Sequence, residues 1–240
     1  MSSRSEMTHR HEPHSDSVAA KLNWLRAGVL GANDGIISTA GLVVGVAAAT
    51  TETSAIATAG VAGLCAGAVS MALGEYVSVS SQRDTEQALI AKESAELEAM
   101  PEAEHAELVH LLQARGLGPE TSRRAADEMT EHDALGTHLS IELGIDQHQL
   151  ASPWVAAGSS AVAFALGAVL PLVAILVPPS GTRIAITFVA VLVALLITGV
   201  VSARLGGAPP RTAVLRLVVG GALAMAVTYG IGELVGSSIA

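Results

Sequence analysis

The sequence is poor in cysteine, in aromatic residues and in charge. Its one cysteine, Cys65, excludes an intramolecular disulfide. Only 2% of the residues are aromatic and 15% are charged, whereas 50% are hydrophobic, which is atypical of a soluble domain. The net charge of −9 argues against nucleic acid as a partner, and no phosphate-binding Gly-Lys-Ser/Thr loop is present for a nucleotide. Small aliphatic residues and glycine make up the rest, as in helices that pack closely inside a bilayer.

Five apolar stretches are long enough to cross a bilayer, which takes roughly 20 helical residues. They lie at 25–49, 55–79, 154–177, 184–203 and 213–236. We therefore expect an all-α integral membrane protein. Its expected parts are a polar tail (1–22), two transmembrane helices (23–80), a helical insert (81–152) and three further transmembrane helices (153–240).

The basic residues predict the orientation of these spans. Five spans put the N-terminus, the 81–152 insert and the 204–212 loop on one side. Of the 13 Lys and Arg residues, Arg183 alone falls on the other side. The positive-inside rule then makes the N-terminus and the insert cytoplasmic and the C-terminus external. In a bacterium the membrane would be the plasma membrane.

Three carboxylates interrupt the apolar spans: Asp34, Glu75 and Glu233. A charge near the bilayer centre costs at least ~2.5–3.5 kcal/mol, so such residues are candidates for function. Asp34, the deepest, is flanked by glycine and suits exchange of a proton for a cation, although a protonated Asp bonded to a neighbouring helix is the alternative. Met71 adds a soft ligand one turn before Glu75. For Glu75, close to the cytoplasmic end of its span, a solvated helix end is the alternative, and Glu233 lies near the outer end of the last span.

The insert concentrates the negative charge. Residues 82–150 hold fifteen Asp/Glu, five Lys/Arg and five His, a net of −10. The second span is expected to continue as helix to about Met100. Pro101 and Pro119 are expected to begin two further helices, the second ending near Gly144 with a break at Gly136.

Potential metal ligands recur in the insert at helical spacing. The pairs are Glu93/Glu96, Glu104/Glu107 and His138/Glu142. Oxygen ligands with an imidazole suit Fe(II), Mn(II) or Zn(II), bound as substrate, and no prosthetic group is predicted. A solvated acidic surface is the alternative. His9, His11 and His14 form a second, looser cluster in the tail.

Glycines recur at four-residue spacing in the spans. The pairs are Gly31/Gly35, Gly41/Gly45, Gly63/Gly67 and Gly232/Gly236. Such spacing lets helix backbones approach closely. It indicates either packing within the chain or a homodimer seam through the first two spans.

Three segments resemble the vacuolar iron transporter family in its bacterial form. They are the Asp-Gly-containing segment 25–35, the Ser-Met-containing segment 67–76 and the segment 141–144. The order of two spans, an acidic helical insert and three spans is also similar to the family's.

The resemblance implies a homodimeric exporter that moves Fe(II), and often Mn(II), out of the cytosol in exchange for protons. By position, the glutamate ligands of the insert would be Glu93, Glu96, Glu104, Glu107 and Glu142, with His138 replacing a family Met. The pore residues would be Asp34 and Met71, followed by Glu75. Ala27 and Gly63 stand where plant-type members carry acids, and Glu75 is a candidate to compensate.

Two other functions compete with transport. Glu102/His105 and Glu107/His110 have the Glu-x-x-His spacing of di-iron enzymes, but such sites need the two motifs on different helices. A membrane-anchored metal sensor or storage protein is the second alternative, and it has no use for a buried Asp34. We therefore expect a secondary transporter and no enzyme, with metal ions, protons and lipid as its partners.

Overall fold

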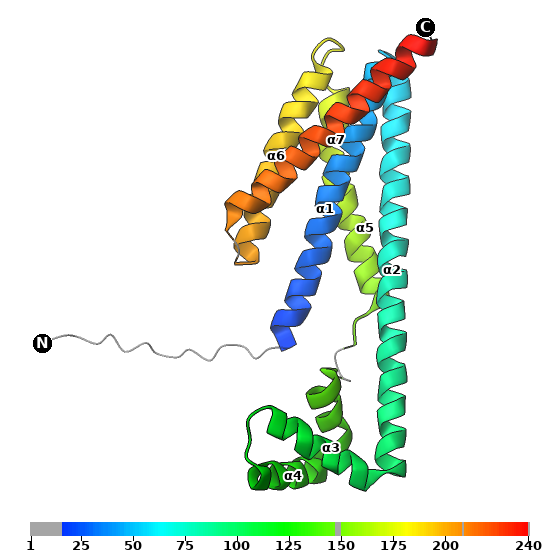
Figure 1. Cartoon of the computed structure of the whole chain (residues 1–240). Coiled ribbons are helices and arrows are strands. Elements are labelled where there is room, and N and C mark those ends of the chain that lie inside the picture. The colour runs from blue at the N-terminus through cyan, green and yellow to red at the C-terminus, as the bar shows by residue number, and fades with distance from the viewer. Residues whose placement is uncertain (1–15, 147–149, 208, 240) are drawn as a thin grey trace, which may run out of the picture. The chain divides into compact units, whose positions relative to one another are not determined.

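The computed structural model describes residues 16–146, 150–207 and 209–239, with side chains between residues 28 and 238. These ranges form helices joined by short connections and contain no strand, which confirms the all-α class (Figure 1). The helices are α1 (Asp16–Ala49), α2 (Thr53–Ala99), α3 (Pro101–Ala114), α4 (Pro119–His138), the π-helix η1 (Leu139–Leu143), α5 (Pro153–Leu176), α6 (Arg183–Leu205) and α7 (Pro210–Ile239). Most of the predicted tail, with His9, His11 and His14, lies outside the described residues.

Five of the described helices are long and apolar enough to cross a membrane, as predicted. The candidate spans are Gly28–Ala49, Thr53–Ala99, Pro153–Leu176, Arg183–Leu205 and Pro210–Ser238. The second is 47 residues long because α2 continues without a break beyond its apolar half, which confirms the expected extension towards Met100.

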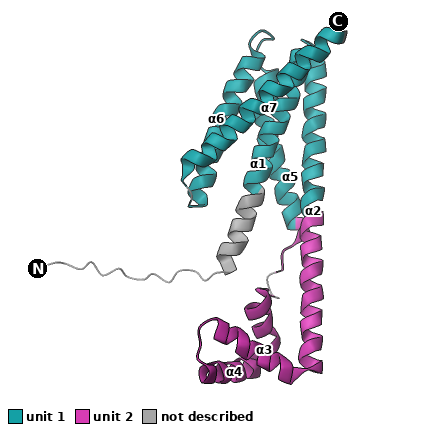
Figure 2. Ribbon diagram, viewed as in Figure 1, with its two compact units in different colours: residues 1–75, 155–240 teal, residues 76–154 magenta. Residues whose placement is uncertain are grey.

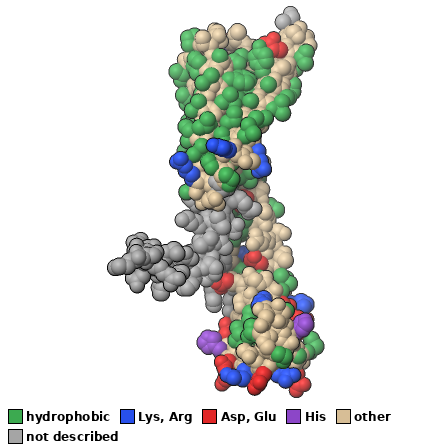
Figure 3. Space-filling model, turned by 60° about the vertical axis from the view of Figure 1, so that its left-hand side comes forward, with side chains coloured by type: hydrophobic (Ala, Val, Ile, Leu, Met, Phe, Trp, Pro, Cys, Tyr) green, Lys and Arg blue, Asp and Glu red, His purple; other side chains and the backbone are tan. Residues whose placement is uncertain are grey.

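The chain divides into two compact units (Figure 2). Unit 1 comprises Met1–Glu75 and Val155–Ala240, and unit 2 comprises Tyr76–Trp154. Their surfaces differ in chemistry, since hydrophobic side chains cover the spans of unit 1 whereas charged and histidine side chains gather on unit 2 (Figure 3). Apolar side chains on the outside of spanning helices match the hydrocarbon of a bilayer.

Unit 1 is held together by aliphatic packing and by backbone contacts at glycine. Ile36, Val43 and Val44 of α1 pack with Leu195 of α6 and Met225 of α7 in its core. A Cβ added to Gly232 would lie 2.0 Å from the Gly45 carbonyl oxygen, so α1 and α7 cross in backbone contact.

The other glycine pairs also lie at contacts inside the chain. Gly31 and Gly35 face α5, Gly41 faces Thr228 of α7, and Gly63 and Gly67 face Leu42 and Phe164. Packing within the chain therefore accounts for the four-residue glycine spacing, whether or not two chains also associate.

Unit 2 folds α3, α4 and η1 around Leu108, Leu112 and Ala126. Gly116, at φ +98°, makes the turn from α3 to α4 in a conformation that favours glycine. The predicted break at Gly136 is wrong: the backbone leaves helical geometry at Asp133 (φ −161°, ψ 89°). There the Asp133 carboxylate accepts a hydrogen bond from the Gly136 N–H at 2.9 Å, as an N-cap does for a new helical segment.

Candidate metal sites

Unit 2 brings together four of the six predicted ligands of the insert. Glu93 comes from α2, Glu104 from α3, His138 from the end of α4 and Glu142 from η1. The His138 Nδ1 atom lies 3.0 Å from Glu93 Oε1, 3.7 Å from Glu142 Oε2 and 3.8 Å from Glu104 Oε2. Ligand atoms of Glu93, Glu104 and His138 all lie within 4.8 Å of one another. We call these four residues the Glu/His cluster.

The core of the cluster is buried and lacks ordinary hydrogen bonds. The exposed fractions are 3% for Glu93, 6% for Glu104 and 1% for His138. Within the described part of the chain, Glu93 Oε1 and both ring nitrogens of His138 make no hydrogen bond of ordinary geometry, although Glu93 Oε1 and His138 Nδ1 lie 3.0 Å apart. Buried polar atoms are otherwise almost always partnered, because leaving one unsatisfied costs ~1–3 kcal/mol. A divalent cation supplies the missing partner for carboxylate oxygens and imidazole alike.

The electrostatics of the cluster also favour a cation. Burial raises the pKa of Glu93, the Glu142 carboxylate raises it further, and the imidazole of His138 opposes these effects. Burial likewise raises the pKa of Glu104, with Glu107 adding to the increase. Carboxylates crowded in this way repel one another when ionised, and bound positive charge relieves the repulsion.

A π-helical turn positions the last two ligands. His138 precedes η1 and Glu142 lies within it, and Gly144 closes the turn with φ +66°. The Arg115 guanidinium, at the end of α3, donates a hydrogen bond to the Ile141 carbonyl next to Glu142. Single π-turns occur frequently at functional sites.

The remaining two predicted ligands lie at the edge of the cluster. Glu96 is half-buried and pairs with Lys92 at 2.7 Å, and Glu107 is exposed on α3. The two Glu-x-x-His motifs both fall on α3 and so do not face each other across helices. Of their histidines, His105 pairs with Asp127 at 2.7 Å.

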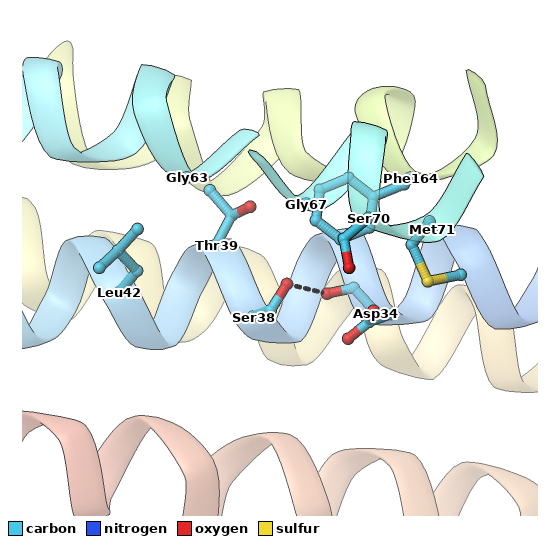
Figure 4. Close-up of a pocket in the computed structure, with 9 residues that line it drawn as sticks. All are labelled: Asp34, Ser38, Thr39, Leu42, Gly63, Gly67, Ser70, Met71 and Phe164. Carbon is cyan, nitrogen blue, oxygen red and sulfur yellow. Dashed lines mark hydrogen bonds between the residues drawn. The ribbon is translucent and has the colours of Figure 1, made fainter. Parts of the chain in front are cut away.

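Unit 1 contains a cavity of about 210 Å³ between α1, α2 and α5. Its lining residues are Asp34, Ser38, Thr39, Leu42, Gly63, Gly67, Ser70, Met71 and Phe164. Figure 4 shows Asp34, Ser38 and Thr39 on α1 facing Ser70 and Met71 on α2. The predicted pair Asp34 and Met71 thus lines one cavity, whereas Glu75 is half-buried outside its lining.

Glycine lets Phe164 and Leu42 pack closely against α2 at the wall of this cavity. A Cβ on Gly67 would lie 2.1 Å from the Phe164 ring, and one on Gly63 would lie 2.3 Å from Leu42 Cδ2. Sequence reasoning missed Ser38, Thr39 and Phe164 as lining residues. Two consecutive hydroxyl residues within an apolar span, close after Asp34, were the available signal.

Comparison with known proteins places the chain in a family. A model of the VIT family matches residues 25–233, which include both the Glu/His cluster and the cavity. The chain belongs to the VIT family. It is similar to a protein of Acanthamoeba castellanii named vacuolar iron transporter, with 43% identity over 93% of this chain and 82% of the relative. Vacuolar iron transporter homolog 2 of Arabidopsis thaliana is 36% identical over 98% of the chain and 95% of the relative. Vacuolar iron transporter homolog 1 of Oryza sativa subsp. japonica is 41% identical over 92% of this chain and 77% of the relative.

Proposed function

We propose that this VIT-family protein is a secondary transporter that exports Fe(II), Mn(II) or both from the cytosol in exchange for protons. The relatives are named vacuolar iron transporter or its homologs, which supports iron as a substrate. The observation that carries the proposal is the buried Glu/His cluster, whose converging carboxylate and imidazole atoms suit these ions. A separate cavity lined by Asp34 and Met71 in the apolar spans supports a second binding position along the transport pathway.

We assign the two sites successive roles. The Glu/His cluster, with Glu96 and Glu107 at its edge, binds the metal ion on the cytoplasmic side. Asp34 and Met71, followed by Glu75, form the pathway through the spans. Asp34 holds either a proton or the metal ion, and this competition couples the two fluxes.

A homodimer in the plasma membrane fits the same scheme. Asp34 lies on an exposed part of α1 within a single chain, beside the exposed Leu30. A carboxylate facing lipid is costly, and a second chain would cover it. The positive-inside rule puts the N-terminus and unit 2 in the cytoplasm and the C-terminus outside.

Metal flux in proteoliposomes tests the proposal. Purified protein is reconstituted, and Fe(II) and Mn(II) flux is followed under imposed pH gradients of either sign. We expect net flux to reverse with the gradient, and Asp34→Asn to abolish it. The matched control is Glu233→Gln, which changes the acid on α7 that accepts a hydrogen bond from Tyr229 and should leave flux intact.

The alternative of a metal sensor or storage protein predicts a different result. Such a protein binds metal through the Glu/His cluster but moves neither ion under any gradient. Folded protein that binds Mn(II) or Fe(II) without flux would therefore refute transport. Flux that ignores the pH gradient would refute proton coupling while leaving metal transport standing.

A further inference from the structure

Thr39 is the most unusual hydroxyl residue of unit 1. Its side chain is 2% exposed, and within the described residues its Oγ1 atom has no hydrogen-bond partner. Three other threonines of the spans follow the usual pattern, in which the hydroxyl donates to a carbonyl of its own helix. Thr187 donates to Arg183, Thr198 to Leu195 and Thr228 to Ala224. The Thr39 hydroxyl is therefore buried without the bond that normally offsets its burial.

The position of Thr39 gives this hydroxyl a use. Thr39 lines the cavity that also contains Asp34 (Figure 4). It follows Asp34 by five residues, a rise of ~7.5 Å along the helix axis. Across the cavity lie Gly63 and Gly67 of α2, and Phe164 and Leu42 occupy the space that side chains at these glycines would need. Since Gly63 and Gly67 have no side chain, α2 offers no side-chain hydrogen-bond partner to the Thr39 hydroxyl at these two positions.

We propose that the Thr39 hydroxyl is a ligand for a hard divalent cation in this cavity, at a second position beyond Asp34. The inference rests on the proposed transport function and deepens it. An uncharged oxygen binds Mn(II) or Fe(II) more weakly than a carboxylate does, which suits a position that an ion must leave. Oxygen ligands favour hard ions, whereas the Met71 thioether favours soft ones, so Thr39 biases the cavity towards hard ions.

The first test removes the hydroxyl while keeping the shape of the side chain. Thr39→Val is expected to raise the Mn(II) concentration for half-maximal flux about tenfold, the change expected when one buried uncharged polar contact is lost. Thr39→Ser keeps the hydroxyl and should transport like the wild type. Thr228→Val, which removes a hydroxyl already bonded within α7, is the matched control.

Thermal stability separates a ligand from a structural hydroxyl. Replacing an unpartnered buried hydroxyl by a methyl group should leave stability unchanged or increase it. We therefore expect Thr39→Val to be at least as stable as the wild type and still impaired in flux. A stable Thr39→Val protein with wild-type Mn(II) flux would overturn the inference.

A change of ligand type gives a second, independent readout. Thr39→Cys, in a Cys65→Ser background, replaces the oxygen by sulfur and should increase the preference for Cd(II) over Mn(II) about tenfold or more, as softer ligands do. An unchanged Cd(II)/Mn(II) preference would contradict a ligand role. Absence of flux in the wild type would instead refute the proposed function, so the two failures are distinguishable.

Discussion

Replacing Glu93 by glutamine should weaken metal binding and stabilise the metal-free protein at the same time. Glu93 is 3% exposed, and its Oε1 atom lies 3.0 Å from His138 Nδ1. In the metal-bound protein, removing the Glu93 carboxylate leaves the buried cation without one of its charged partners, which costs ~3–5 kcal/mol. Since 1.4 kcal/mol is a tenfold change in affinity, the dissociation constant for Mn(II) or Zn(II) should rise roughly 100-fold or more.

The metal-free protein should respond in the opposite direction. Burial and the neighbouring Glu142 carboxylate raise the pKa of Glu93, so its ionised form is destabilising in the absence of metal. An amide of the same shape removes this charge. We therefore expect the metal-free Glu93→Gln variant to unfold at a higher temperature than the wild type, and added metal to raise its unfolding temperature less.

Titration calorimetry and thermal unfolding of the full chain in detergent measure both effects. An Asp34→Asn background weakens binding in the cavity, so that the titration reports the Glu/His cluster. Glu98→Gln, an exposed glutamate on the same helix, is the matched control. If Glu93→Gln kept wild-type affinity, or lost affinity together with metal-free stability, the reasoning from the cluster would be refuted.

Three further predictions concern the Glu/His cluster, the Asp133 cap and the contact between Gly67 and Phe164. Because the pKa values of Glu93 and Glu104 are raised, the folded metal-free protein holds these two protons more strongly than the unfolded chain does. The stability of the metal-free protein should therefore fall as the pH rises above 4.5, the ordinary pKa of glutamate. Unfolding temperatures measured across pH should show a smaller fall in a Glu93→Gln/Glu104→Gln variant. Asp133→Ala removes the cap on Gly136 and should cost about 1 kcal/mol in thermal unfolding, whereas the exposed Glu131→Ala should not. Gly67→Ala pushes its Cβ against the Phe164 ring and should reduce flux in proteoliposomes, and Gly67→Ala/Phe164→Ala should restore it.

The spans were predictable because hydropathy and length alone determine which helices match a bilayer. The break in α4 was mispredicted because Gly136 is not the helix breaker: Asp133 leaves helical geometry and caps the following segment through the Gly136 N–H. Asp is a preferred N-cap residue because its side chain can accept a hydrogen bond from the N–H three residues later, so Asp133 is itself a recognisable capping signal. Both residues were visible in the sequence, and the capping role identifies the correct one.

Spacing alone did not indicate which glutamate of each pair is buried. Glu104 and Glu107 lie on neighbouring positions of α3, yet Glu104 is 6% exposed and Glu107 is exposed. The reason is the apolar stripe of α3: Leu108 and Leu112 are buried at four-residue steps, and Glu104 continues that row by one turn. Reading the glutamates against the leucines would have selected Glu104.

The resemblance to plant-type members implies acids at residues 27 and 63, where this chain has Ala27 and Gly63. At one of them, Gly63, Leu42 occupies the space that a side chain would need, 2.3 Å from an added Cβ. The side chain that occupies this space lies 21 residues earlier, on another helix, which a single sequence does not reveal. Among the described residues that line the cavity, Asp34 is then the one carboxylate, and Ser38, Thr39 and Ser70 supply neutral oxygens. A Gly63→Asp side chain displaces the end of the flexible Leu42 side chain, so its effect on proton coupling is measured both alone and together with Leu42→Ala.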